Sequence, residues 1–170
     1  MSARVFVDTP VLCGHRGSGR GVGENTLPSF RAAVAAGLPW VEVDARLTAD
    51  GVLVAYHEAV LPNGRYVSQL PAGETDEIGL MRVADLFEDL PPGIGVDVDM
   101  KSSLEDAQRP RGETTAALTA DLVAPHAGRR PLVGANPANG YTTTASGSQV
   151  TVAGNISVNP ISIDVLIGDV

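Results

Sequence analysis

Short apolar runs alternate with segments of helical period along most of the chain. Runs bounded by glycine, proline or polar residues predict strands over residues 11–14, 40–44, 53–57, 94–100 and 131–135. Apolar residues at helical spacing predict helices that begin near Leu27 and Val83, and a further helix over residues 114–123. Strands that alternate with helices in this way predict an α/β fold.

The connection between the second and third predicted strands determines how Asp44 and His57 lie relative to each other. It is short, whereas a parallel crossover usually needs about a dozen residues or more. Asp50-Gly51 is a strong signal for a two-residue hairpin turn, and such a turn would place Asp44 directly opposite His57. A loop returning to a parallel strand would instead bring both residues to the same rim of a barrel. The pattern does not decide between these connections, and both place His57 near Asp44.

The composition changes after about Pro131. From there to Val170 the sequence has no Lys, Arg, Glu or His, and threonine, serine, asparagine, glycine and β-branched residues dominate. Such a segment predicts short strands and turns rather than further βα units. We therefore expect an N-terminal part over residues 1–130 and a divergent or aberrant tail, rich in strands and turns, over residues 131–170.

Charge, hydrophobicity and cysteine content limit the binding partners and the cellular location that we expect. The formal net charge is −8 at pH 7, and such a surface repels nucleic acid and anionic membranes, so we expect no nucleic-acid partner. No stretch approaches the roughly 20 apolar residues of a transmembrane helix. The N-terminal residues lack a basic flank and an apolar run, so we expect no signal peptide. The single cysteine, Cys13, excludes an internal disulfide. These features favour a cytoplasmic location.

Charged residues gather at the ends of the predicted strands. In chain order they are His15-Arg16, Glu42 and Asp44, His57-Glu58, and Asp97, Asp99 and Lys101, the only lysine. Carboxylates suit Mg²⁺ or Ca²⁺, and Arg or Lys can neutralise a phosphoryl group. Imidazole groups ionise near neutral pH, so two histidines can serve as base and acid. This set of groups is what the cleavage of a phosphodiester requires.

The order and spacing of these motifs resemble the N-terminal signature of the glycerophosphodiester phosphodiesterase family. The resemblance rests on His15-Arg16-Gly17, Glu24-Asn25-Thr26, Phe30, Gly37, Glu42-Val43-Asp44, Thr48-Ala49-Asp50-Gly51, His57, the segment 83–87 and Asp99-Met100-Lys101. It covers roughly residues 11–101, with a weak echo at residues 131–137. It implies a TIM-type (β/α) barrel and the hydrolysis of glycerophosphodiesters to an alcohol and glycerol phosphate.

The same resemblance implies a role for each matching residue around a small-molecule phosphodiester and a divalent cation, Mg²⁺ or Ca²⁺. The implied groups are the catalytic pair His15 and His57, the phosphate-binding residues Arg16 and Lys101, the metal ligands Glu42, Asp44 and Asp99, and the supporting residues Glu24, Asn25 and Glu58. It leaves open whether water or a neighbouring substrate hydroxyl attacks the phosphorus.

Three features depart from the family's pattern. The family usually has Asp where this chain has Glu58, and Glu where this chain has Asp99, so that Asp97 competes for the role of third ligand. A complete barrel of this type has eight strands and about 250 residues. We therefore expect an incomplete or truncated barrel with an irregular β-rich tail, whose open strand edges leave room for oligomerisation.

Two other functions stay open on the sequence. An incomplete barrel could be an inactive domain that at most binds metal or phosphate. The two histidines would also serve a related phosphodiesterase or lyase that acts on phospholipid head groups, in which case a cyclic phosphate would be the final product.

Overall fold

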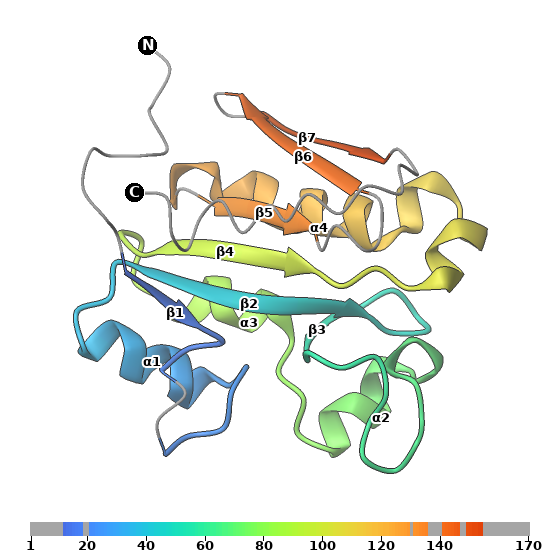
Figure 1. Cartoon of the computed structure of the whole chain (residues 1–170), viewed down its shortest axis with the longest axis horizontal. Helices are drawn as coiled ribbons and strands as arrows, with labels where there is room; N and C mark the ends of the chain where they lie inside the picture. The colour runs from blue at the N-terminus through green and yellow to red at the C-terminus, as the bar shows by residue number, and fades with distance from the viewer. Residues whose placement is uncertain (1–11, 19–20, 130, 136–140, 147–148, 155–170) are drawn as a thin grey trace.

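A five-stranded sheet organises the part of the chain that the computed structural model describes, residues 12–18, 21–129, 131–135, 141–146 and 149–154. The strands are β1 (Cys13–His15), β2 (Trp40–Leu47), β3 (Leu53–Ala55), β4 (Gly95–Met100) and β5 (Pro131–Ala135). The sheet order is β1-β2-β4-β5, with β3 also paired to β2 (Figure 1). All pairings are parallel except β2–β3, which confirms the predicted α/β fold with an open, mostly parallel sheet.

Helices follow the strands as the periodicity predicts. The α-helices are α1 (Leu27–Ala35), α2 (Ala72–Glu77), α3 (Val83–Asp89) and α4 (Thr115–Val123), and short 3-10 helices span Val67–Gln69, Leu104–Gln108, Arg111–Glu113 and Ala124–Arg129. Thr26 caps α1 by accepting the Ser29 N–H at 3.3 Å, and Thr114 caps α4 by accepting the Ala117 N–H at 3.2 Å. The short helix α2 was not predicted, because it carries no apolar face of helical period.

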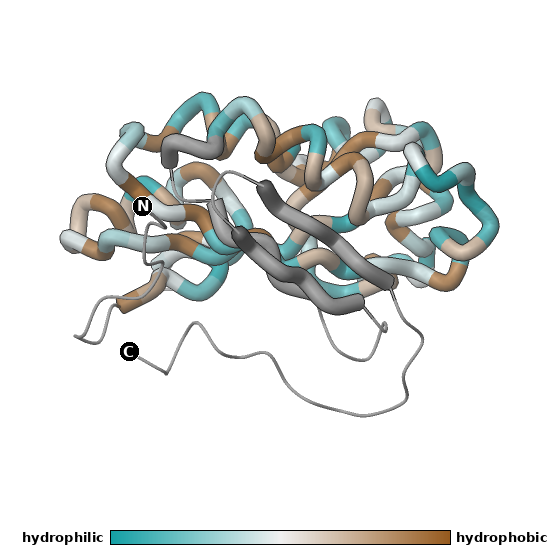
Figure 2. Tube along the Cα trace, turned by 90° about the horizontal axis from the view of Figure 1, so that it is seen from above, coloured by the Kyte–Doolittle hydropathy of each residue, from teal (hydrophilic) through white to brown (hydrophobic). Residues whose placement is uncertain are grey.

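Alternate residues of the central strands build two different faces. Figure 2 shows hydrophobic and hydrophilic residues alternating along the chain. Val41 and Val43 of β2 are fully buried with Val96 and Val98 of β4, and α1 and α3 contribute Phe30, Leu86 and Phe87 to the same apolar core. Because side chains alternate along a strand, the residues between these valines point to the opposite face, which carries the charged groups described below.

The connection between β2 and β3 is a hairpin, but its turn is longer than the Asp50-Gly51 signal indicates. The register pairs Ala45 with Ala55 and Leu47 with Leu53, so Asp44 lies opposite Tyr56 and not opposite His57. Of the two connections that the sequence left open, the parallel return is therefore excluded, and the hairpin turn is one residue longer than Asp50-Gly51 alone. Residues 49–51 form a three-residue turn that ends in Gly51 at φ 85°, the left-handed position such turns favour.

The segment after residue 130 divides between two sheets. The strand predicted over residues 131–135 is β5, which pairs parallel with β4, while β6 (Tyr141–Ser146) and β7 (Gln149–Gly154) pair antiparallel in a sheet of their own. The division of the chain at residue 130 into two parts stays a prediction. Across the described residues, no helix is both long and apolar enough to cross a membrane.

Candidate active site

Strands β1 and β3 share one edge of β2 and leave a gap between them. β1 pairs with residues 40–42, β3 pairs with residues 45–47, and β4 occupies the other edge. Asn25 lies at this gap: its Oδ1 accepts the Asp44 backbone N–H at 3.2 Å, and its Nδ2 donates to Asp44 Oδ2 at 2.8 Å. Asn25 is buried and has φ 56°. Its side chain thus takes the place of a missing strand and fixes the Asp44 carboxylate.

The face opposite the apolar core gathers carboxylates. The register places Glu42 beside Asp97 and Asp44 beside Asp99, and residues paired in this way point to the same side of a parallel sheet. One carboxylate oxygen from each of Glu42, Asp44 and Asp99 lies within 4.8 Å of the others. The structure therefore brings together the three residues predicted to bind a divalent cation.

Burial and mutual repulsion raise the pKa of two of these carboxyl groups. Burial raises the pKa of Glu42 to about 8, and the neighbouring Asp44 charge adds to the shift. Burial raises the pKa of Asp97 to about 7, with Asp99 as the next cause. Asp97 Oδ1 accepts no hydrogen bond from any residue the structure describes. Negative charge in this cluster is thus only partly compensated by the chain itself.

Asp44 is the carboxylate whose negative charge is stabilised most fully by neighbouring side chains. Burial alone would raise its pKa, but hydrogen bonds from Asn25, Lys101 and His57 outweigh burial and lower it. Lys101 Nζ lies 3.0 Å from Asp44 Oδ1 and also donates to Asp99 Oδ2. Burial opposes the charge of Lys101, yet these two carboxylates raise its pKa above the ordinary value. The only lysine therefore stays charged within the acidic cluster.

A strained turn after β1 positions His15 and Arg16. Arg16 has φ 54° and Gly17 has φ 94°, both in the left-handed region that only glycine adopts freely. This turn aims the Arg16 backbone N–H at Glu42 Oε2, 2.9 Å away, and His15 Nε2 lies 3.8 Å from the same oxygen. The Arg16 side chain lies 3.1 Å from Asp44 Oδ2 and 3.2 Å from Glu24 Oε2. Both predicted residues thus lie against the carboxylate cluster.

His57 reaches the same cluster from the end of β3. Its Nδ1 lies 3.1 Å from Asp44 Oδ1, and its Nε2 lies 3.3 Å from an Arg16 guanidinium nitrogen. Because arginine can only donate, Nε2 accepts this hydrogen bond, and Nδ1 carries the proton that faces Asp44. Glu58 is mostly exposed, with Oε1 3.8 Å from Nε2. The geometry therefore selects one neutral tautomer of His57.

Arg46 belongs to this site, although it lies in none of the motifs that the sequence contains. Its Nε donates to the His57 carbonyl at 3.0 Å, and its guanidinium also donates to the Lys101 carbonyl at 3.4 Å. Burial lowers the pKa of Arg46, while the charge of Asp44 opposes that shift. Strand period could have identified this residue, because Arg46 lies two positions after Asp44 on the same face of β2.

The donor set fits a hard divalent cation. Three carboxylates within reach of a single point are the oxygen ligands that Mg²⁺ and Ca²⁺ prefer. The raised pKa of Glu42 points the same way, because a cation between these groups would relieve the repulsion that causes part of the shift. Glu42, Asp44 and Asp99 are thus the residues that would hold such an ion.

Comparison with known proteins finds sequence relatives of one family. Residues 15–92 match the sequence model of the glycerophosphoryl diester phosphodiesterase family. A glycerophosphodiester phosphodiesterase of Caldanaerobacter subterraneus is 40% identical over 48 residues, which cover 28% of this chain and 20% of that protein. A glycerophosphocholine phosphodiesterase of Eremothecium gossypii is 43% identical over 61 residues, which cover 31% of this chain and 4% of that protein. The chain thus spans a fifth or less of these relatives.

Solved structures extend the likeness to the fold. A phosphodiesterase of Oleispira antarctica, solved with the product sn-glycerol-3-phosphate, superposes with a TM-score of 0.57 at 26% identity, covering 69% of this chain and 53% of that one. A glycerophosphodiester phosphodiesterase of Agrobacterium tumefaciens gives a TM-score of 0.59 at 23% identity, covering 75% and 58%. The open sheet is therefore part of a TIM-type barrel, as expected. Over residues 15–92 the chain therefore resembles the glycerophosphodiester phosphodiesterase family, as a partial domain.

Proposed function

We propose that this chain hydrolyses glycerophosphodiesters to an alcohol and glycerol phosphate, with a divalent cation, Mg²⁺ or Ca²⁺, as cofactor. The single observation that carries the proposal is the meeting of His57, Arg16 and Lys101 on the carboxylate of Asp44, beside Glu42 and Asp99. This cluster offers a proton-transfer group, two cations for phosphoryl oxygens and a set of oxygen ligands within one small volume.

In this proposal His57 acts through its Nε2 atom. The Asp44 carboxylate holds the proton on Nδ1, which leaves the Nε2 lone pair as the group that accepts a proton. Arg16 donates to that lone pair. A phosphoryl oxygen that draws the Arg16 guanidinium toward itself would free Nε2 for proton transfer. His15, largely exposed beside Glu42, would be the second proton-transfer group.

The positive groups of the site are arranged to bind an anionic substrate. Arg16 lies on one side of Asp44 and Lys101 on another, so a phosphoryl group that approaches the cluster meets both. A divalent cation held by Glu42, Asp44 and Asp99 would supply further positive charge against the negative charge that builds up on the phosphoryl oxygens. Glu24 and Asn25 would keep Arg16 and Asp44 in place.

The test is the release of glycerol phosphate from a glycerophosphodiester by the purified chain. We expect His57→Ala and His15→Ala each to lower kcat/KM about 10²–10⁴-fold, which is the range for loss of a general acid or base. His126→Ala, a histidine outside the cluster, serves as the matched control and should retain activity. Turnover that is the same in all three variants would refute the assignment of the two histidines.

The same assay separates the two rival functions. An inactive domain that only binds metal or phosphate would give no product at any metal concentration. A lyase would accumulate a cyclic phosphate as its final product, whereas the proposed hydrolase yields the open monoester. A cytoplasmic location, small-molecule partners and oligomerisation through the open edges of the sheet stay predictions.

A further inference from the structure

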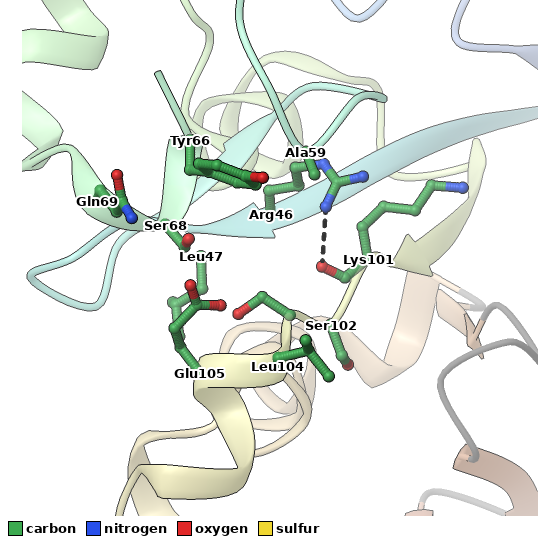
Figure 3. Close-up of a pocket in the computed structure, with 11 residues that line it drawn as sticks. Arg46, Leu47, Ala59, Tyr66, Ser68, Gln69, Lys101, Ser102, Leu104 and Glu105 are labelled. Atoms are coloured by element: carbon green, nitrogen blue, oxygen red, sulfur yellow. Dashed lines mark hydrogen bonds between the residues drawn. The ribbon is translucent and has the colours of Figure 1, made fainter. Parts of the chain in front are cut away.

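A cavity of about 460 Å³ adjoins the carboxylate cluster, and its volume is in the range of small-molecule sites. Two walls face each other across it (Figure 3). The first wall comes from β2 and from the chain after β3, with the residues Arg46, Leu47, Ala59, Tyr66, Ser68 and Gln69. The second wall is the start of the segment that follows β4, residues 101–105. Lys101 also contacts Asp44 and Asp99, so a substrate whose phosphoryl group lies at the cluster would extend between the two walls.

The first wall is joined to the turn between β2 and β3. The Ala49 N–H donates to the Leu70 carbonyl at 2.8 Å, and the Asp50 carboxylate accepts the Ala72 N–H at 2.9 Å. Leu70 is 1% exposed and packs in an apolar cluster on this side of the cavity. The first wall and the turn therefore form one body, which hydrogen bonds and apolar packing both stabilise.

The second wall continues into the segment 102–109, which is built differently. Most of this segment is the 3-10 helix Leu104–Gln108, a conformation with poorer hydrogen-bond geometry than an α-helix. The Leu104 side chain is 91% exposed, so it contributes little packing. Asp106 is buried and accepts the Thr115 N–H at 3.2 Å, which ties the segment to the start of α4 and not to the first wall. Its distance from the first wall must therefore be fixed by other contacts.

Arg109 makes such a contact. Its Nη2 donates to the Thr48 carbonyl at 2.9 Å and to the Ala49 carbonyl at 3.4 Å, and both carbonyls belong to the turn that is joined to the first wall. Glu105 faces the same way: Figure 3 shows its carboxylate directed toward Ser68 of the first wall. Hydrogen bonds from its own backbone and from nearby serines, one of them Ser68, lower the pKa of Glu105, and the Arg109 charge adds to the shift.

We propose that Arg109 is a positioning residue that fastens the segment 102–109 to the β2–β3 turn and so sets the width of the substrate cavity. Lys101 is held independently of this contact, because its N–H donates to the Ala45 carbonyl at 2.9 Å and its own carbonyl accepts from Arg46. Loss of Arg109 would therefore loosen the second wall and leave the phosphate-binding lysine in place. The kinetic consequence rests on the proposed hydrolase, whereas the fastening itself does not.

The kinetic test measures glycerophosphodiester hydrolysis by Arg109→Ala. We expect KM to rise about three- to tenfold, the range for loss of one hydrogen bond of ordinary strength, with kcat changed less than about twofold. Arg109→Lys should recover part of the loss, because a single ammonium group can still donate to one of the two carbonyls. Arg111→Ala removes an exposed arginine two residues further along the chain and is the matched control, which should keep the wild-type KM.

Hydrogen–deuterium exchange reads the fastening without turnover. We expect peptides that cover residues 102–109 to exchange at least about fivefold faster in Arg109→Ala than in the wild type or in Arg111→Ala, with α1 unchanged. Faster exchange throughout the chain, α1 included, would mean that Arg109 only stabilises the fold and would overturn the inference.

The two readouts together distinguish the inference from the proposed function. Unchanged exchange in Arg109→Ala, or faster exchange with an unchanged KM, would overturn the inference and leave the proposed hydrolase standing. Faster exchange of residues 102–109 in a chain whose wild type releases no glycerol phosphate would support the fastening and refute the hydrolase.

Discussion

The imidazole Nδ1 of His57 lies 3.1 Å from Oδ1 of Asp44, although the two residues are not paired across the hairpin. Tyr56 takes the position opposite Asp44, with its backbone N–H donating to the Asp44 carbonyl at 3.2 Å. His57 follows after β3 has ended, so its ring turns back toward the carboxylate. Asp44 thereby becomes the residue around which the histidine, both cations and Asn25 are arranged.

Asn25 is expected to be essential for the stability of this arrangement. Asn25→Ala would leave the Asp44 N–H and one carboxylate oxygen without their partner in a buried place. Loss of buried hydrogen bonds of this kind costs about 1–3 kcal/mol, so we expect a decrease of that size in the free energy of unfolding. Urea denaturation measures it. Asn63→Ala, at an exposed turn, is the control, and an equal cost for both variants would contradict the role of Asn25.

Gly17 is expected to tolerate no side chain. A Cβ at this position would lie 2.3 Å from Ser29 Oγ and 2.7 Å from the Ser29 backbone carbon, and φ is 94°. Gly21 also has positive φ, 72°, but a Cβ there would meet nothing within 4 Å. Gly17→Ala should therefore lower the thermal midpoint far more than Gly21→Ala, whose cost should be about 1 kcal/mol. Similar midpoints for the two variants would show that the turn before Arg16 is not tightly packed.

Asp50 makes the stability of the hairpin depend on pH. Its carboxylate accepts hydrogen bonds from Thr48 Oγ1 at 2.7 Å and from the Ala72 N–H at 2.9 Å, and the first of these is the main cause that lowers its pKa. A carboxyl group whose pKa is lower in the folded state stabilises the fold above its unfolded pKa, about 4. That stabilisation is lost as the pH falls through the lowered folded value.

Comparison with Asp50→Asn isolates this effect. At neutral pH the variant should unfold at lower denaturant concentration, by about 1 kcal/mol, because an amide accepts these hydrogen bonds less strongly. The difference in the free energy of unfolding between the wild type and Asp50→Asn should decrease below pH 4. A difference that stays constant with pH would mean that the Asp50 charge does not contribute to stability.

Arg46 is expected to hold the two segments that carry His57 and Lys101. Lysine at this position keeps the charge but lacks the fork that donates to both carbonyl groups. We expect Arg46→Lys to lower kcat at least about tenfold with a smaller effect on KM, because the reacting groups would be displaced. Arg31→Lys, in an exposed pair with Asp89, is the matched control. Equal kcat values for both variants would show that Arg46 does not position the reacting groups.

Much of the fold could be predicted because its determinants are local. The valines of β2 and β4 alternate with acidic residues, and this pattern alone gives one apolar face and one charged face. The length of the turn at residues 49–51 could not be predicted, because Asp50-Gly51 suits both a two- and a three-residue turn.

The sequence predicts which residues form the site better than it predicts the contacts between them. The motifs gave His15, Arg16, Glu42, Asp44, His57, Asp99 and Lys101, and the structure places all of them around one cluster. That Lys101 binds two of the carboxylates, and that Arg46 donates to two carbonyl groups, depends on the register between β2 and β4 and on the path after β3. These are long-range pairings that strand period alone does not fix.

We propose that this cluster acts on a phosphodiester with the help of a divalent cation. The most direct measurement is glycerol phosphate release by the metal-stripped chain as Mg²⁺ or Ca²⁺ is added back, for the wild type and for Glu42→Gln. We predict no release without the cation, full recovery on addition, and a weaker apparent affinity for the cation in Glu42→Gln. Release that persists in excess chelator, at the same rate in both proteins, would show that the cluster does not use a divalent cation.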